Sequence, residues 1–402
     1  MRVRIYPSVP AGSITAPPSK SMAHRLLICA GLAQGESLIR GVALSQDVLA
    51  TADCLRALGA EVRFEGNDVL VRGTDPTFAR EAVYPCRESG STLRFFIPLC
   101  LLSESEKRLE GSPGLFSRPL SVYEKILAEQ KLPYEKGDTC LTVHGRLKPG
   151  TFTVEGGISS QFVSGLLFAL PLLESDSRIE ITPPVESRSY ISMTCEALRR
   201  FGIHAVRETE NTFRIPGRQR YLAQSGSVEG DWSNAAFFLA MGIPAEGLEE
   251  NSIQGDRVCG EYFRRLERGS AELDISDCPD LGPVLFAYAA LHHGGVFTGT
   301  DRLRIKESDR GEAMKKELRK FGVEAEIGDN RIRIGCGISP PGEELDGHND
   351  HRIVMALAVL CVRTGGIIRG AEAVNKSFPD FFEQLEKAGV RMETENGMDI
   401  EK

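Results

Sequence analysis

One pattern recurs along the chain and limits the folds that it can adopt. Each copy is an amphipathic helix ending in an apolar residue and a glycine, followed by a short strand, a polar turn and a second strand. The glycine is a typical helix C-cap and the Gly, Asn or Asp turn closes a hairpin, so each copy predicts a helix that leads into a two-stranded ribbon. Clear copies lie at 55–73, 198–217, 318–337 and 385–402, and weaker ones at 127–146 and 263–275.

A second helix, apolar nearly all round, is predicted before each amphipathic one. A helix without a polar face is buried, so these helices must lie inside a domain with sheets and amphipathic helices around them. Six such units, three in each domain, predict a two-domain α/β protein. The apolar segments are 26–33, 93–102, 162–173, 235–243, 283–291 and 353–362.

The boundary between the two domains is expected after the third unit. There the segment 217–230 is polar and rich in Gly and Ser, as linkers often are. The strand before Pro17 is expected to pack with the second half of the chain. The expected division is 18–227 for the first domain and 1–17 plus 228–402 for the second, with hinges near 17–18 and 226–230.

Charge and cysteine usage narrow the kinds of partner. The chain has 48 basic and 56 acidic residues and a net charge of −8, which argues against nucleic acid or an anionic membrane as a partner. The ten cysteines are spread evenly without a C-x-x-C pair, a pattern typical of reduced core thiols in a cytosolic protein. The N-terminus lacks a signal-peptide core, and the nearly uncharged stretch 161–173 is too short to span a bilayer. We expect a soluble, cytoplasmic protein.

Residues that can cap a helix precede all six apolar helices. Capping alone could explain any single one of them. If the helices run side by side, however, their starts converge on one face, where free N–H groups suit anions. Basic residues lie beside these starts or in nearby loops; singly, each is more often a solvated surface charge, but together they predict a site for carboxylates or phosphates. They are Lys20, Arg25, Arg94, Arg118, Lys306, Arg310, Arg352 and Lys376.

Two other motifs have alternative interpretations. His348 and His351 could be a metal pair, but no Cys and no further His lies near them, so a structural or positioning role is favoured and no metal is expected. The alternating charges of 305–310 could simply be a solvated helix start. A Walker loop, a G-x-G-x-x-G motif after a strand and a G-x-S-x-G elbow are all absent from the sequence, so nucleotide-binding and acyl-hydrolase functions have no support.

Eight motifs occur in a fixed order, most of them at expected helix starts. In this order they resemble the 5-enolpyruvylshikimate-3-phosphate synthase family, and the match runs from residue 18 to 380. The resemblance implies a two-domain inside-out α/β barrel, each domain having three βαβαββ units with buried helices. The motifs are Pro18-Ser19-Lys20-Ser21-x-x-x-Arg25, Ser89-Gly90-Ser91-x-x-Arg94, Ser117-Arg118-Pro119-Leu120, Ser159-Ser160-Gln161, Pro279-Asp280, Arg304-x-Lys306-Glu307-Ser308-Asp309-Arg310, Asn349-Asp350-His351-Arg352 and Lys376-Ser377-Phe378-Pro379.

The same resemblance implies a reaction and its binding residues. The family transfers the enolpyruvyl group of phosphoenolpyruvate to shikimate 3-phosphate and releases phosphate, without a metal or organic cofactor. For shikimate 3-phosphate the implied residues are Ser21 and Arg25 at the carboxylate, Ser159, Ser160 and Ser187 at the phosphate, and Gln161, Tyr190, Lys20, Asp280 and Lys306 nearby. For phosphoenolpyruvate they are Lys20, Gly90, Arg118 and Lys376 at the phosphate, Arg310 and Arg352 at the carboxylate, and Gln161.

Catalytic roles also follow from the resemblance. Asp280 is the candidate base on the attacking 5-hydroxyl, Lys306 a partner of that hydroxyl, Glu307 the candidate acid for the enol methylene, and Lys20 a further catalytic residue. A carboxylate enclosed near a bound anion can have its pKa raised toward neutrality, as such roles require. Neither half of the chain would hold a complete site, so the halves are expected to close on the ligands.

Three departures from the family pattern are visible. Glu88 and Arg302 each stand where Asn is usual, and Arg188-Ser189 replaces Lys-Pro before Tyr190. An extra carboxylate near the phosphoenolpyruvate site could repel that substrate or pair with a neighbouring Arg, and pairing is favoured because an unpaired buried charge is costly.

Two alternative functions remain open on the sequence. UDP-N-acetylglucosamine enolpyruvyl transferases share the fold, but they usually carry a reactive Cys in the loop that corresponds to 111–118, and none lies there. A non-catalytic anion-binding homologue is the other, and Asp280 and Glu307 speak against it because carboxylates weaken anion binding. The expected partners are the two small-molecule substrates, with the chain acting as a monomer.

Overall fold

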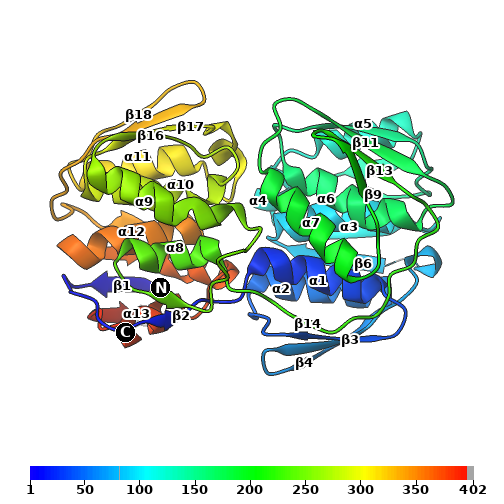
Figure 1. Ribbon diagram of the computed structural model, residues 1–402, viewed down its shortest axis with the longest axis horizontal. Helices are drawn as coiled ribbons and strands as arrows, with labels where there is room; N and C mark the ends of the chain where they lie inside the picture. The colour runs from blue at the N-terminus through cyan, green and yellow to red at the C-terminus, as the bar shows by residue number, and fades with distance from the viewer. Residues whose placement is uncertain (81, 396–402) are drawn as a thin grey trace, which may run out of the picture. The chain divides into compact units, whose positions relative to one another are not determined.

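The computed structural model describes residues 1–80 and 82–395, and the chain divides into two compact units (Figure 1). The first unit is Pro18–Glu229, and the second unit combines Met1–Pro17 with Gly230–Lys402. The division therefore falls at 17–18 and at 229–230, compared with 17–18 and 227–228 predicted from the sequence.

Three four-stranded sheets with the same topology form the outside of the first unit, as far as its residues are described. Each sheet pairs two parallel strands and continues into an antiparallel hairpin, in the orders β14-β3-β5-β4, β6-β7-β9-β8 and β10-β11-β13-β12. The strands are β3 (Glu36–Arg40), β4 (Glu61–Glu65), β5 (Asp68–Arg72), β6 (Ala82–Arg87), β7 (Lys107–Gly111), β8 (Tyr134–Lys136), β9 (Cys140–Val143), β10 (Thr151–Glu155), β11 (Ser177–Thr182), β12 (Val206–Thr209), β13 (Thr212–Ile215) and β14 (Gly226–Ser227).

Three buried helices lie inside these sheets, at the positions predicted from the apolar segments. They are α1 (Lys20–Leu32), α3 (Gly90–Cys100) and α6 (Ser160–Ala169). Two of them approach closely because α6 has Gly165, where a Cβ would lie 2.5 Å from the Arg94 carbonyl oxygen of α3. The other helices are α2 (Gln46–Leu58), the short α4 (Pro113–Phe116), α5 (Ser121–Glu129) and α7 (Arg188–Arg200).

Two sheets of the second unit follow the same plan, whereas the third has only the parallel pair among the described residues. Strand β1 (Arg2–Ile5) lies between β21 and β22, so the N-terminal segment does pack with the second half. Its described sheets have the orders β20-β21-β1-β22, β16-β17-β19-β18 and β15-β2. The strands are β2 (Ile14–Thr15), β15 (Ala245–Glu246), β16 (Ala271–Asp274), β17 (Gly295–Thr298), β18 (Ala325–Ile327), β19 (Arg331–Ile334), β20 (Leu345–Asp346), β21 (Gly366–Arg369) and β22 (Met392–Glu395).

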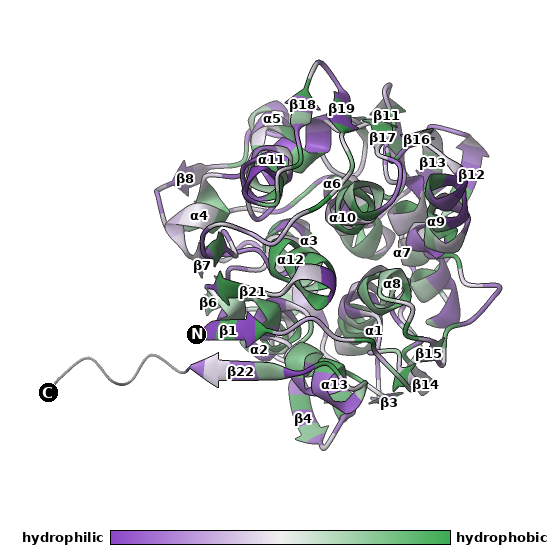
Figure 2. Ribbon diagram, turned by 90° about the vertical axis from the view of Figure 1, so that its left-hand side faces the viewer, coloured by the Kyte–Doolittle hydropathy of each residue, from purple (hydrophilic) through white to green (hydrophobic). Residues whose placement is uncertain are grey.

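Its helices alternate between buried and amphipathic, as predicted. In Figure 2 the buried helices are green for most of their length, whereas α9 and α11 carry purple, hydrophilic residues. The buried helices are α8 (Trp232–Ala240), α10 (Gly282–Leu291) and α12 (His351–Thr364), and the amphipathic ones α9 (Cys259–Arg268), α11 (Arg310–Lys320) and α13 (Phe381–Lys387). Among the described residues, no helix has the length and apolar character needed to cross a membrane.

One of the six predicted hairpins is wrong. The weak copy at 263–275 has its helix and one strand, β16, but that strand pairs in parallel with β17 of the next unit. The chain then turns at Ser276, whose N–H donates to Asp274 Oδ1 at 2.9 Å, and continues directly into α10. For the copy at 385–402, α13 and β22 are present and its last residues lie outside the described chain.

All ten cysteines are free thiols, but they are not all in the core. Seven are buried, Cys140 and Cys195 are partly exposed, and Cys336, which follows strand β19, is exposed.

Candidate functional site

Arg310 is the centre of a buried charge cluster in the second unit. Its side chain is 1% exposed. Nη1 donates to Asp280 Oδ1 at 2.8 Å, Nη2 to Glu307 Oε2 at 2.6 Å, and Nε to Asp350 Oδ2 at 2.8 Å. The alternative of a solvated helix start at 305–310 is therefore wrong for Arg310, which is buried and fixed by three carboxylates.

Asp280 lies in a short 3-10 turn just before α10 and receives two more cations. Lys306 Nζ is 3.1 Å from Oδ1, and Arg352 Nη2 is 3.4 Å from Oδ2. Burial alone would raise the pKa of Asp280, but the charges of Arg352, Lys306 and Arg310 outweigh it and hold the pKa well below its usual range. Burial lowers the pKa of Lys306 despite the nearby Asp280 charge. The Asp280 carboxylate is thus ionised and can accept a proton.

The start of α12 brings the remaining cations of this unit to the cluster. Asp350 caps the helix by accepting the N–H of Arg352 at 2.9 Å, and it also accepts the Ser308 hydroxyl at 3.0 Å. Lys376 Nζ donates to the carbonyl oxygen of Asn349 at 2.7 Å. Arg352 lies at the start of α12, as the sequence predicted, and the contact with Asn349 brings Lys376 to the same helix start.

His348 and His351, at the start of α12, contact different carboxylates. His348 Nε2 is 3.0 Å from Glu317 Oε1, whereas His351 Nδ1 is 3.8 Å from Asp350 Oδ1. Burial would raise the pKa of Glu317, but hydrogen bonds from His348 and Lys320 lower it. Within residues 1–80 and 82–395, no group of three His, Cys, Asp or Glu side chains has the arrangement of a metal site.

In the first unit, Arg25 is buried against its predicted neighbours. Its Nη1 donates to the Ser21 carbonyl oxygen at 2.6 Å, Nη2 to the Tyr190 carbonyl oxygen at 3.0 Å, and Nε to Thr194 Oγ1 at 2.8 Å. The guanidinium also lies 5.4 Å from the centre of the Phe95 ring. Burial lowers the pKa of Arg25 to about 10, so it remains a cation at neutral pH. Ser21, Arg25 and Tyr190 thus form one group.

Gly90, at the start of α3, lies against two guanidinium groups. A Cβ at Gly90 would be 2.8 Å from Arg118 Nη1 and 3.0 Å from Arg94 Nη1. Arg94 Nη1 donates to Gln161 Oε1 at 2.8 Å, and Gln161 Nε2 donates to Ser91 Oγ at 2.9 Å. The structure therefore brings together Gly90, Arg118 and Gln161, through an arginine that the sequence placed at a helix start without assigning it a ligand.

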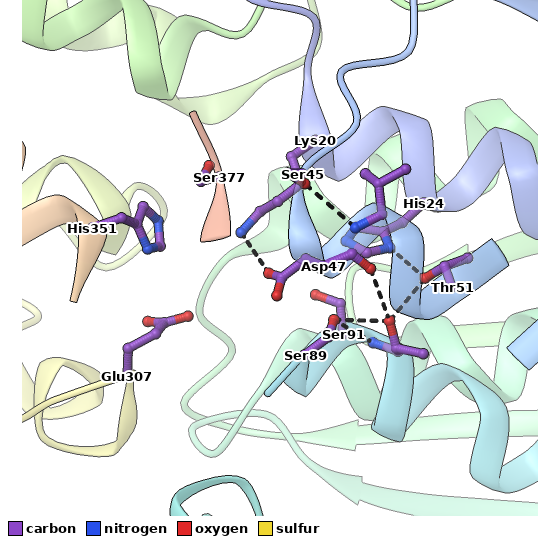
Figure 3. Close-up of polar contacts among 12 residues, drawn as sticks. Lys20, His24, Ser45, Asp47, Thr51, Ser89, Ser91, Glu307, His351 and Ser377 are labelled. Carbon is purple, nitrogen blue, oxygen red and sulfur yellow. Dashed lines mark hydrogen bonds and ion pairs between the residues drawn. The ribbon is translucent and has the colours of Figure 1, made fainter. Parts of the chain in front are cut away.

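Lys20, the first residue of α1, forms an ion pair that the sequence did not predict. Its Nζ lies 2.9 Å from Oδ2 of Asp47, in the first turn of α2, and the two side chains are 14% and 13% exposed (Figure 3). An acidic residue two positions after the capping Ser45 was the available signal, but such residues are common in the first turn of any helix.

Two adjacent helix starts carry the serines predicted for a phosphate. Ser159 caps α6 by accepting the N–H of Gln161 at 3.3 Å, and Ser160 is the buried first residue of that helix. Ser187 precedes α7 in a left-handed conformation with φ of 55° and is buried. Strands β10 and β11 pair in parallel, and α6 and α7 follow them in the chain, so the two helix starts lie at the same end of that sheet.

The positions that depart from the family pattern have different surroundings. Arg188 donates to the Glu210 carbonyl oxygen and to Asn211 Oδ1, both at 3.0 Å. Arg302 is buried, and its charge adds to the effect of burial in lowering the pKa of Lys306. Pairing of Glu88 with an arginine stays a prediction.

The chain is similar to known proteins along most of its length. The family model of EPSP synthase (3-phosphoshikimate 1-carboxyvinyltransferase) matches residues 7–385. A 3-phosphoshikimate 1-carboxyvinyltransferase of Clostridium kluyveri is 39% identical, covering 96% of this chain and 97% of the relative; one of Clostridioides difficile is 37% identical, covering 98% and 99%.

Solved structures agree on the fold. An EPSP synthase from Acinetobacter baumannii superimposes with a TM-score of 0.79 at 22% identity, covering 98% of this chain and 100% of that one. The enolpyruvyl transferase NikO from Streptomyces tendae has a TM-score of 0.73 at 16% identity, covering 98% of each chain. At these identities the two structures show the two-domain α/β fold alone.

Proposed function

The chain belongs to the EPSP synthase (3-phosphoshikimate 1-carboxyvinyltransferase) family, and we propose that it transfers the enolpyruvyl group of phosphoenolpyruvate to the 5-hydroxyl of shikimate 3-phosphate. It is a transferase of the shikimate pathway, which supplies aromatic amino acids. The observation that carries the assignment of roles is the Asp280 carboxylate, which is ionised and surrounded by three cations.

We assign shikimate 3-phosphate to the first unit's serines and Arg25. Arg25 has a fixed guanidinium beside Ser21 and Tyr190, which suits a carboxylate. The N–H groups and hydroxyls at the starts of α6 and α7 suit a phosphate, and they come from Ser159, Ser160 and Ser187, with Gln161 next to them.

For phosphoenolpyruvate we propose contributions from both units. Its phosphate is assigned to Lys20, Gly90 and Arg118, which lie at or beside the starts of α1 and α3, with Gln161 near them. The second unit contributes Lys376 to that phosphate, and Arg310 and Arg352 to the carboxylate. A guanidinium group can bind an anion with two parallel N–H groups, and at Arg310 the substrate carboxylate would take N–H groups that now donate to Asp280 and Glu307.

The proposed reaction begins at Asp280. The Asp280 carboxylate takes the proton of the 5-hydroxyl while Lys306, 3.1 Å from Asp280, donates a hydrogen bond to the same oxygen. That oxygen attacks the enol carbon that bears the phosphate, and Glu307 gives a proton to the methylene carbon. Glu307 then takes a proton back from the new methyl group as the bond between the same carbon and the phosphate oxygen breaks, which forms the enol ether and releases phosphate beside Lys20. The proton that Asp280 took from the 5-hydroxyl leaves on the released phosphate.

The low pKa of unliganded Asp280 is compatible with a base role. A substrate carboxylate that binds Arg310 and Arg352 shares the two charges that now lower this pKa and adds a negative charge nearby. The pKa of Asp280 therefore rises when phosphoenolpyruvate binds, and the carboxylate becomes a stronger base in the complex that reacts.

No metal or organic cofactor is needed in this proposal, because side chains supply the proton transfers and the electrostatic stabilisation that the steps require. One copy of the chain suffices, since all assigned residues belong to it. We place the reaction in the cytoplasm, where free thiols such as the ten cysteines persist.

A phosphate-release assay tests the proposed function. Phosphoenolpyruvate is supplied with shikimate 3-phosphate in one arm and with UDP-N-acetylglucosamine in the other. We expect release in the first arm alone. Release with the nucleotide sugar would assign the chain to the related transferases, and release in neither arm, with anion binding intact, would indicate a non-catalytic homologue.

A further inference from the structure

A chain of buried hydroxyl groups joins the starts of three helices in the first unit (Figure 3). His24 Nδ1 of α1 lies 2.6 Å from Thr51 Oγ1 of α2, and Thr51 Oγ1 lies 2.8 Å from Thr92 Oγ1 of α3. The Thr92 hydroxyl donates to Oγ of Ser89, the cap of α3, at 2.8 Å. All four side chains are fully buried, and the proposed reaction assigns none of them to a substrate.

The hydrogen bond from Thr92 to Ser89 determines which group donates in each of the other hydrogen bonds of this chain. Thr92 gives its one hydrogen to Ser89, so Thr51 must donate to Thr92 and accept from His24 Nδ1–H. Burial, and then the charges of Lys20 and Arg25, hold the pKa of His24 well below its usual range, so the ring is neutral. Its Nε2 is then a buried acceptor that has no hydrogen-bond partner among the described residues.

This arrangement is costly, because a buried acceptor without a partner loses its hydrogen bonds to water. Apolar side chains between α1, α2 and α3 would avoid that cost. Hydrogen bonds are directional, unlike apolar contacts. Those of 2.6 to 2.8 Å in this chain therefore fix how each helix is rotated about its axis and shifted along it relative to the next helix.

The hydrogen-bonded chain from His24 to Ser89 lies next to residues assigned to the phosphate of phosphoenolpyruvate. In α1 it begins one helical turn after Lys20. Lys20 and His24 are four residues apart in α1, and Asp47 and Thr51 are four apart in α2, so each pair shares a helix face. The earlier residues of the two pairs form the Lys20–Asp47 ion pair of 2.9 Å. The later residues, His24 and Thr51, form the first hydrogen bond of the hydroxyl chain. The last link ends at Ser89, directly before Gly90.

We propose that Thr51 and Thr92 are positioning residues for the phosphate of phosphoenolpyruvate. Through the buried chain they set the start of α3 relative to α1 and α2, so that Lys20 and the N–H groups that follow Ser89 bind one phosphate together. This inference rests on the proposed function, and neither threonine touches the substrate.

Steady-state kinetics of Thr92→Val and Thr51→Val test the inference. Valine keeps the shape of threonine and removes the hydroxyl, so the helix starts lose their alignment but keep their packing. We expect each variant to raise the KM for phosphoenolpyruvate about fivefold to tenfold, the effect of one hydrogen bond. The KM for shikimate 3-phosphate should stay within about twofold of wild type. Thr92→Ser keeps the hydroxyl and should restore the wild-type KM.

Two matched variants separate positioning from general stability. Thr194→Val removes a buried hydroxyl that accepts Arg25 Nε at 2.8 Å, and it should raise the KM for shikimate 3-phosphate instead. Tyr221→Phe removes a buried hydroxyl that donates to the Phe168 carbonyl oxygen at 2.7 Å, near the far end of α6. This last change should lower the melting temperature and leave both KM values unchanged.

The inference is overturned if the threonine variants do not affect the KM for phosphoenolpyruvate selectively. If Thr92→Val and Thr51→Val fold and change both KM values equally, or neither, the threonines only support packing. If both variants fail to fold, Thr92→Ser still decides, because a raised KM for phosphoenolpyruvate despite the retained hydroxyl would refute the account. A wild-type chain without turnover rejects the proposed function, and this inference with it.

Discussion

The guanidinium of Arg310 lies 2.8 Å from the carboxylate of Asp280, and the two side chains differ in exposure, at 1% and 16%. The fully buried Asp350 forms a second ion pair with Arg310, with Oδ2 of Asp350 2.8 Å from Nε of Arg310. Asp280 is therefore anchored by a cation that cannot move away, while its own carboxylate stays accessible from one side. A base in this position keeps its orientation while a substrate approaches.

Replacement of Asp280 by Asn should nearly abolish turnover. The amide keeps the shape of the side chain but cannot take the proton of the 5-hydroxyl, so we expect kcat to fall by about a hundredfold or more. Binding of shikimate 3-phosphate, measured by calorimetry, should stay within about tenfold because Arg25 and the serines are unchanged. Turnover near the wild-type rate would remove Asp280 from the catalytic role.

Asp256 should make stability depend on pH. Burial, and then the charge of Asp280, raise the pKa of Asp256 to about 6, above the value of about 3.9 for an unfolded aspartate. The folded protein thus binds this proton more tightly, so the contribution is full below about pH 4 and is lost as pH rises through about 6. Asp256→Asn, which mimics the protonated form, should raise the denaturation midpoint relative to wild type at about pH 7.5. The difference should shrink toward about pH 4.5, and an equal difference at both pH values would contradict the assignment.

Arg118→Ala should weaken phosphoenolpyruvate binding alone. Loss of a charged hydrogen bond to phosphate costs about 2 kcal/mol, or roughly thirtyfold in Kd. Arg108→Ala is the matched control, because Arg108 is an exposed arginine that pairs with Glu110. Calorimetry that showed weaker binding of shikimate 3-phosphate instead would mean that the two substrate sites are assigned the wrong way round.

Gly90→Ala should produce a folded enzyme with poorer affinity for phosphoenolpyruvate. The added methyl group would lie 2.8 Å from Arg118 Nη1 and 3.0 Å from Arg94 Nη1, so these flexible guanidinium groups must shift away from the start of α3. We expect the KM for phosphoenolpyruvate to rise about tenfold or more with little change in melting temperature. An unchanged KM would show that neither arginine acts on this substrate next to Gly90.

The buried helices and their starts could be predicted from the sequence because their signal is local. A segment such as 353–362 has no polar face, so burial follows from composition, and a capping residue such as Asp350 marks where the helix begins. The hairpin expected at 263–275 was wrong because a helix, a glycine and one strand do not specify the partner of that strand. Strand pairing depends on contacts that are distant in sequence.

Side-chain direction was the part of the site that the sequence could not supply. Arg94 was noted at a helix start, but its link from Gly90 to Gln161 depends on a rotamer and on the approach of α6. Asp47 and Asp256 resemble ordinary solvated acids in sequence. Asp47 becomes part of the site because α2 packs beside α1, and Asp256 is linked to the site because it is buried where the charge of Asp280 raises its pKa.

Proton NMR of one reaction mixture tests the central claim most directly. Wild-type protein and Asp280→Asn are each incubated with phosphoenolpyruvate and shikimate 3-phosphate, and the vinylic protons are followed. The account predicts that wild type converts the vinylic signals of phosphoenolpyruvate into those of an enol ether on C5 of the shikimate ring, with equal phosphate release, and that Asp280→Asn does not. Phosphate release without the enol ether, or equal conversion by both proteins, would contradict it.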